Sequence, residues 1–159
     1  MDYNRTLNLG AGNDQWGTDR LDIKKVDPSI KLFDLNSGKK LPYENDLFSE
    51  IKLWGLMEYL SNPQFILNEC YRVAKKGCLI KVDTPNISSM RFFLRPFGDR
   101  YRKHYYGDLK RMGFFDMHTL TNRIKLAGFD ILYEECQSRL PPFRDWLHVV
   151  GEKNTTTSY

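Results

Sequence analysis

The residues best suited to binding chemistry stand near the start of the chain, where a short apolar segment runs into two glycines. Thr6-Leu7-Asn8-Leu9 is followed directly by Gly10-Ala11-Gly12. Glycine adopts backbone angles that other residues avoid, and it leaves no side chain between the main chain and a ligand. A Gly-x-Gly turn of this kind lets the edge of a sheet approach a nucleotide-like molecule closely. Such turns also occur by chance, so the interpretation depends on the residues that come after the turn.

Two carboxylates come at the ends of the next two apolar segments. Asp22 stands near the end of residues 19–23, and Asp34 ends residues 30–34. The carboxyl ends of parallel strands meet at one edge of a sheet, where α/β proteins bind their ligands. A carboxylate there accepts hydrogen bonds from hydroxyl or amino groups. The alternatives are that Asp22 is an ordinary polar residue at a strand end, and that Asp34 begins the turn Asn36-Ser37-Gly38.

Later segments continue this order of apolar runs and turns. They are Leu41-Pro42-Tyr43, Leu56-Met57-Glu58-Tyr59-Leu60, Glu69 to Gly77, Thr84-Pro85-Asn86, Phe115 to Phe129 and Leu147 to Lys153. In order and spacing, the whole series resembles the small class I S-adenosylmethionine-dependent methyltransferases of type 11. The resemblance covers nearly the whole chain except residues 87–113 and the tail. It implies methyl transfer, with S-adenosylmethionine as the cofactor.

The resemblance also implies a role for particular residues. Gly10 and Gly12 would pass under the methionine part of the cofactor, and Asp22 would bind the ribose hydroxyls. Asp34 would meet the adenine amino group, with Leu35 against the ring. The cofactor-binding residues expected in this way are Leu9, Gly10, Ala11, Gly12, Asp22, Ile23, Asp34, Leu35, Trp54 and Gly55. Simple core packing is the alternative for Trp54.

No catalytic base can be named from the sequence. The resemblance places Tyr59 where the family has a histidine, so a base at that position is missing. His104 and His118 are the weak candidates that remain. No metal site is expected, because the cysteines are odd in number and scattered through apolar stretches, which is typical of free thiols. They are Cys70, Cys78 and Cys136.

The pattern predicts an α/β fold: a Rossmann-like, mostly parallel sheet of about seven strands. The expected strands are residues 6–10, 19–23, 30–34, 48–54, 78–83, 129–135 and 146–152. Helices are expected over residues 63–76, ending at Gly77, and over residues 116–127 with Asp116 as the cap. The links 13–18 and 24–29 are too short for a crossover helix. We therefore expect the first crossover helices to be shortened or missing.

Between Arg91 and Arg111 the chain interleaves basic and aromatic residues. The favoured interpretation is a cap or lid over the methyl-donor site, formed by residues 87–113. The alternative is a surface for nucleic acid, because aromatic rings and cations together bind single strands. This alternative predicts affinity for oligonucleotides that falls steeply with salt.

Composition bounds the remaining possibilities. A chain of 159 residues with a hydrophobic fraction of 41% predicts one domain, over residues 1–153, with residues 154–159 as a disordered tail. No apolar run reaches the roughly 20 residues of a membrane span, and we expect a cytoplasmic protein. The leading hypothesis is methyl transfer, such as O-methylation, to a small or medium-sized acceptor, including glycan-like ones. The alternatives are a cofactor-binding pseudo-enzyme or interaction module and a nucleic-acid methyltransferase.

Overall fold

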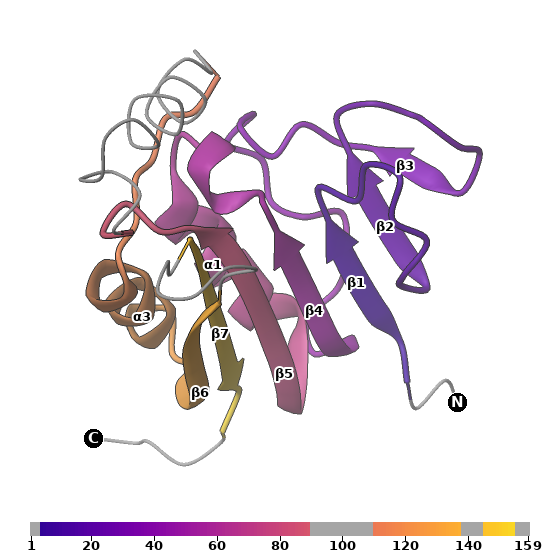
Figure 1. The fold of residues 1–159 in the computed structure, drawn as a ribbon. Coiled ribbons are helices and arrows are strands. Elements are labelled where there is room, and N and C mark those ends of the chain that lie inside the picture. The colour runs from indigo at the N-terminus through magenta and orange to yellow at the C-terminus, as the bar shows by residue number, and fades with distance from the viewer. Residues whose placement is uncertain (1–3, 90–109, 138–144, 155–159) are drawn as a thin grey trace.

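A seven-stranded sheet forms the centre of the computed structural model, which describes residues 4–89, 110–137 and 145–154 (Figure 1). The strands are β1 (Thr6–Leu9), β2 (Asp19–Asp22), β3 (Ile30–Leu32), β4 (Phe48–Trp54), β5 (Ala74–Pro85), β6 (Asp130–Gln137) and β7 (Trp146–Glu152). Their order in the sheet is β3-β2-β1-β4-β5-β7-β6, and β7 alone runs opposite in direction to the other strands. The predicted Rossmann-like α/β fold is therefore confirmed.

Two α-helices cover one face of this sheet. α1 (Pro63–Val73) connects β4 to β5, and α3 (Met117–Leu126) lies between β5 and β6. Their apolar residues join those of the strands in one core, whose members include Leu9, Leu53, Val82, Val149, Ile66, Cys70, Leu120 and Ile124. None of the helices in the described ranges has the length and apolar character needed to cross a bilayer.

The helix boundaries follow local hydrogen bonding. The side chain of Asn62 accepts a hydrogen bond from the Phe65 amide at 3.1 Å, and Pro63 occupies the first helical position. Asp116 caps α3 as predicted, accepting from the Thr119 amide at 2.7 Å. The predicted end of α1 at Gly77 is wrong, because the chain enters β5 at Ala74 and Gly77 lies within that strand.

The links that lead out of β1 and β2 contain no helix, as their lengths predict. Residues 13–18 and 24–29 form turns and irregular backbone. The link from β3 to β4, residues 33–47, also lacks a helix, although its length gave no reason to expect this. Something other than helix packing must therefore hold these three links on the sheet.

Arg20, from the middle of β2, holds the first two links. Its guanidinium is buried, with the residue 8% exposed. It donates to the carbonyl oxygen of Asp14 at 3.1 Å and to Oε1 of Gln15 at 3.2 Å, both in the first link. It also makes a two-pronged pair with Asp27 of the second link, at 2.9 and 3.1 Å. One side chain thus fastens both loops to the same face of the sheet.

Two further polar side chains of the sheet support the first link. Asn8 on β1 donates to the carbonyl oxygen of Trp16 at 3.1 Å. Lys52 on β4 is buried, pairs with Asp14, and lies over the ring of Trp54 at 3.4 Å from its centroid. The face that carries Asn8, Arg20 and Lys52 is the one opposite α1 and α3, because side chains alternate between faces along a strand. Polar contacts to a loop therefore replace apolar contacts to a helix there.

The third link, between β3 and β4, is held by hydrogen bonds to side chains of α1 instead. Glu69 accepts a hydrogen bond from the Leu41 amide at 2.8 Å. Arg72 donates to the carbonyl oxygens of Tyr43 at 2.9 Å and Leu41 at 3.1 Å, and it pairs with Glu69 at 2.7 Å. These bonds satisfy the backbone of a loop whose Leu41 side chain is buried in the core.

Replacing Arg20, the β2 residue that holds both links, tests this account of the fold. Arg20→Ala removes hydrogen bonds to both links and leaves Asp27 without its cation, so we expect the free energy of unfolding to fall by about 2–4 kcal/mol. Chemical denaturation measures this loss. Lys125→Ala, on the exposed surface of α3, is the control and should change stability by less than about 0.5 kcal/mol. Equal stability of the two variants would show that the loops are held by other contacts.

Candidate functional site

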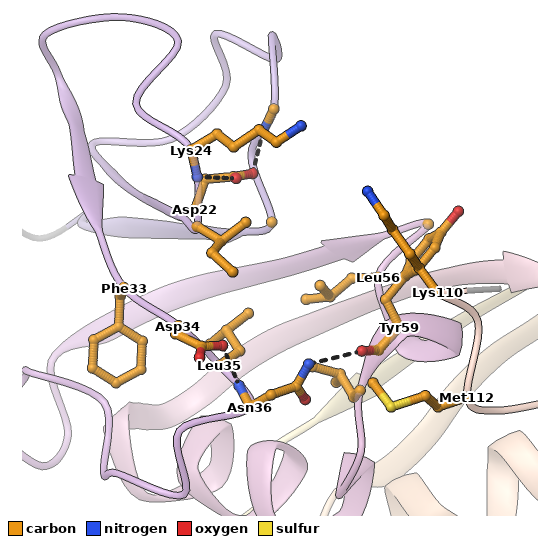
Figure 2. A pocket seen from close by; sticks show the side chains of 15 residues that line it. Asp22, Lys24, Phe33, Asp34, Leu35, Asn36, Leu56, Tyr59, Lys110 and Met112 are labelled. Carbon is orange, nitrogen blue, oxygen red and sulfur yellow. Dashed lines mark hydrogen bonds between the residues drawn. The ribbon is translucent and has the colours of Figure 1, made fainter. Parts of the chain in front are cut away.

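A cavity of about 710 Å³ opens at the carboxyl ends of the parallel strands β1 to β4 (Figure 2). Its volume falls within the roughly 300–1,000 Å³ typical of small-molecule sites. The lining combines glycine backbone, apolar side chains and a few charged groups. It consists of Gly10, Gly12, Asp22, Ile23, Lys24, Phe33, Asp34, Leu35, Asn36, Gly55, Leu56, Tyr59, Leu60, Lys110 and Met112.

The glycine turn forms one wall of this cavity. Gly10 has a positive φ of 67°, and its amide and that of Ala11 both donate to the carbonyl oxygen of Leu21, at 2.9 and 3.1 Å. A Cβ atom at Gly10 would come within 2.9 Å of the Leu56 side chain. The turn therefore requires glycine at position 10 for both its backbone angle and its contact with Leu56.

Asp22 ties this turn to the loop after β2. One carboxylate oxygen accepts a hydrogen bond from the Gly12 amide at 2.8 Å, and the other accepts from the Lys24 amide at 2.8 Å (Figure 2). A carboxylate has about four acceptor positions, so both oxygens can still accept bonds from a ligand in the cavity. Asp22 is thus both a structural acceptor and part of the lining.

Asp34 also has two roles. Its carboxylate accepts from the Asn36 amide at 2.9 Å, and its carbonyl oxygen accepts from the Ser37 amide at 3.1 Å, so it begins a turn. Its side chain lines the cavity as well. Asn36 then donates to the carbonyl oxygen of Tyr59 at 3.0 Å (Figure 2). Tyr59 ends the 3₁₀ helix η1 (Met57–Tyr59), so this bond joins the loop after β3 to the segment after β4.

Most of the predicted cofactor residues gather around this cavity. Those in the lining are Gly10, Gly12, Asp22, Ile23, Asp34, Leu35 and Gly55. Leu9 precedes the glycine turn and Ala11 lies within it. Both residues are buried, and neither lines the cavity. Trp54 lies outside the lining, 50% exposed, with its ring against Lys52. The contact of each residue with a cofactor stays a prediction.

Several lining residues were not proposed from the sequence. Leu56, Tyr59 and Leu60 lie in a segment that contributes to the family resemblance. That resemblance is the signal from which their place in the lining could have been predicted. Lys110 and Met112 fall within residues 87–113, the segment predicted as a cap over the methyl-donor site, although neither was named as a cofactor residue. Hydrogen bonds from the Met112 and Gly113 amides to the carbonyl oxygen of Glu58, at 2.7 and 3.0 Å, bring that segment to the cavity.

Of the two candidate bases, only His118 falls within the described residues, and it does not line the cavity. His118 is exposed on α3, where Nε2 lies 3.0 Å from the Asn122 amide nitrogen. His104 and most of the predicted cap, residues 87–113, lie outside the described residues. Among the residues that the structure describes, no three His, Cys, Asp or Glu side chains could share a metal ion. Burial raises the pKa of the Cys78 thiol to about 12, so this thiol is not a ready nucleophile.

Neither a protein-family model nor a curated protein sequence matches this chain, whereas many solved structures do. A methyltransferase from Thermotoga maritima, described as a possible histamine N-methyltransferase, is 16% identical with a TM-score of 0.70, over 97% of this chain and 84% of that one. A Methanosarcina mazei S-adenosylmethionine-dependent methyltransferase is 12% identical with a TM-score of 0.70, over 97% and 94%. The cyclase SpnF is 15% identical with a TM-score of 0.68, over 96% and 75%.

This chain has the class I methyltransferase fold. The fold implied by the resemblance is confirmed by these structures, which share it over nearly the whole chain. At such low identity the likeness establishes the fold alone, and one fold hosts many reactions. The presence of a cyclase among the similar structures makes the same point. The reaction must therefore be argued from the cavity.

The double role of Asp22 leads to a prediction about local stability. Asp22→Ala removes the acceptor for two backbone amides, so we expect hydrogen exchange at Gly12 and Lys24 to accelerate by about 10–100-fold, which corresponds to about 1.4–2.8 kcal/mol. Amide exchange followed by NMR measures this. The Asn36 amide, bound to Asp34, is an internal control that should keep its rate. Unchanged exchange at Gly12 and Lys24 would mean that other acceptors hold the turn.

Proposed function

We propose that the chain binds S-adenosylmethionine in this cavity and transfers its methyl group to a small or medium-sized acceptor. The observation that carries the proposal is the convergence of the Gly10 turn, Asp22 and Asp34 on one cavity at the carboxyl edge of the sheet. The methyltransferase fold of the chain supports it.

The residues present fit the parts of such a cofactor. The spare acceptor positions of Asp22 suit the two ribose hydroxyls. Asp34, with the apolar side chains of Phe33 and Leu35 beside it, suits the amino group and ring of adenine. The glycine turn leaves room for the methionine part at Gly12, where no atom lies within 4 Å of the position that a Cβ would take.

The cofactor supplies an activated methyl group bound to a sulfonium sulfur. The protein's part is to hold that group in line with the acceptor and to keep water away. Leu56, Leu60 and Met112 provide an apolar wall for this purpose. A proton acceptor is also required when the acceptor is a hydroxyl.

The second candidate function is cofactor binding without turnover. It is favoured by Tyr59 in place of the family's histidine and by the absence of crossover helices in residues 13–18 and 24–29. A nucleic-acid acceptor was predicted only from the basic aromatic segment, which lies almost entirely outside the described residues. We favour a small or glycan-like acceptor, because the cavity has the volume typical of small-molecule sites.

Calorimetry with S-adenosylhomocysteine tests the binding site. Asp22→Ala should weaken binding by about 1–3 kcal/mol, as expected for the loss of charge-assisted hydrogen bonds. Asp34→Ala should weaken it too, while Asp34→Asn keeps an acceptor for the Asn36 amide and separates adenine recognition from turn stability. Lys125→Ala on α3 is the control. If the wild-type protein does not bind, the proposal is wrong.

Turnover is tested separately with a radioactive methyl donor and a panel of hydroxyl, amine and glycan acceptors. Labelled product would support the enzyme over the binding module. Oligonucleotides belong in the same panel, at low and moderate salt. Tight binding that weakens with salt would replace the small acceptor with a nucleic acid.

A further inference from the structure

Asp83 occupies an unusual position near the carboxyl end of β5. Its neighbours on the same strand, Val82 and Thr84, are fully buried on the helix-covered side, so Asp83 points to the opposite face. In the sheet register it stands between Trp54 of β4 and His148 of β7. A carboxylate, an imidazole and an indole thus lie in one row across three strands.

This row adjoins the cavity. Gly55, the residue after Trp54, lines the cavity and donates its amide to the carbonyl oxygen of Asp83 at 2.8 Å. Asp83 is therefore one strand away from the cavity wall, on the side where β4 and β5 end. In the sheet register, Trp146 pairs with Pro85, two residues further along β5. The indoles of Trp54 and Trp146, which are about half exposed, lie on either side of the Asp83 position.

One oxygen of the Asp83 carboxylate is left without a partner within the described part of the chain, and the Thr84 backbone opposes the shift of its pKa only in part. Its Oδ1 atom is buried and has no hydrogen-bond partner there. Burial, and then the charge of Glu58, raise the pKa of Asp83 to about 6. Glu58 is bound to the hydroxyl of Thr84 at 2.9 Å. A buried acceptor left without a donor needs an explanation, such as a catalytic role or a water molecule.

The charged groups around Asp83 do not neutralise it. Lys81 on β5 is paired with Glu50 at 2.6 Å. Lys52 on β4 is held by Asp14. The pKa of His148 on β7 is lowered by burial, which favours its neutral form. The site around Asp83 therefore remains short of positive charge.

We propose that the acceptor binds beside the cavity, over the row of Trp54, Asp83 and His148, and that Asp83 accepts the proton of its nucleophilic O–H or N–H. The inference rests on the proposed function. In this step the acceptor atom bonds to the methyl carbon as its proton passes to the Asp83 carboxylate. The carbon–sulfur bond breaks with its electron pair going to sulfur, so the cationic sulfonium becomes a neutral thioether. Asp83 must be ionised to act, and the adjacent cation would favour that form.

The charge of the methyl donor supplies a test that needs no acceptor. We compare the titration of the Asp83 carboxyl carbon by NMR in complexes with S-adenosylmethionine and with S-adenosylhomocysteine. The cationic donor should lower the midpoint by about 0.5–1 pH unit relative to the neutral product, as expected for a charge a few ångströms away. The Asp116 carboxyl at the start of α3 is the control and should titrate identically in both complexes.

The outcomes separate the two proposals. If both ligands bind and the Asp83 midpoint does not move, Asp83 is a buried carboxylate satisfied by water and the inference fails, while the cofactor site stands. If neither ligand binds, the proposed function is wrong, and this inference, which depends on it, is wrong too. A lowered midpoint confined to the S-adenosylmethionine complex supports the assignment.

Asp83→Asn adds a readout in the free protein. A carboxyl whose pKa is raised on folding contributes stability below its unfolded pKa of about 3.8, and that contribution is lost as pH rises through about 6. The variant should therefore be more stable than the wild type above pH 6 and no more stable at pH 4. It should also bind S-adenosylhomocysteine within about twofold of the wild type, because the Asp83 side chain does not line the cavity. A uniform loss of stability at both pH values would overturn the assignment.

Discussion

Arg20 lies inside the structure with its charge met by Asp27 and by oxygen atoms of Asp14 and Gln15, and the first half of the sheet depends on this arrangement. Burying a guanidinium is costly unless all its donors are used. Here the donors are used on two loops that have no helix to pack against the sheet. Loops without helices expose backbone groups that need partners, and Arg20 with Asn8 and Lys52 provides them.

The candidate site is therefore built on loops that charged side chains hold in place. Asp22 repeats the principle at the carboxyl edge, where it holds the backbone of the Gly12 turn and of the Lys24 loop. Glu69 and Arg72 do the same for the third link from the other side of the sheet. A chain whose first three links contain no helix can thus still form a cavity at the carboxyl edge of its sheet. The loss of apolar helix packing is offset by hydrogen bonds to charged groups, which are individually stronger than neutral ones.

Much of this arrangement could be predicted from the sequence, and the failures have physical causes. The short spacing between Gly12 and Asp19 excluded a crossover helix, and Asp116 before an apolar pattern marked the start of α3. The end of α1 was misplaced because Gly77 resembles a helix cap, whereas its place within a strand depends on pairing with distant residues. Met112 is held at the cavity by the bonds of its own amide and that of Gly113 to Glu58, a long-range contact whose partner the sequence does not indicate. The row of Trp54, Asp83 and His148 depends on strand register, which only the assembled sheet reveals.

The central claim is that one cavity, built on the Gly10 turn, Asp22 and Gly55, holds the adenosyl cofactor. An NMR titration of the wild-type protein with S-adenosylhomocysteine tests it most directly. The account predicts that the amides of Gly10, Gly12, Lys24 and Gly55 shift together and saturate at one ligand per chain, while the amides of α3 stay unchanged. Shifts confined to another part of the sheet, or none at all, would contradict it.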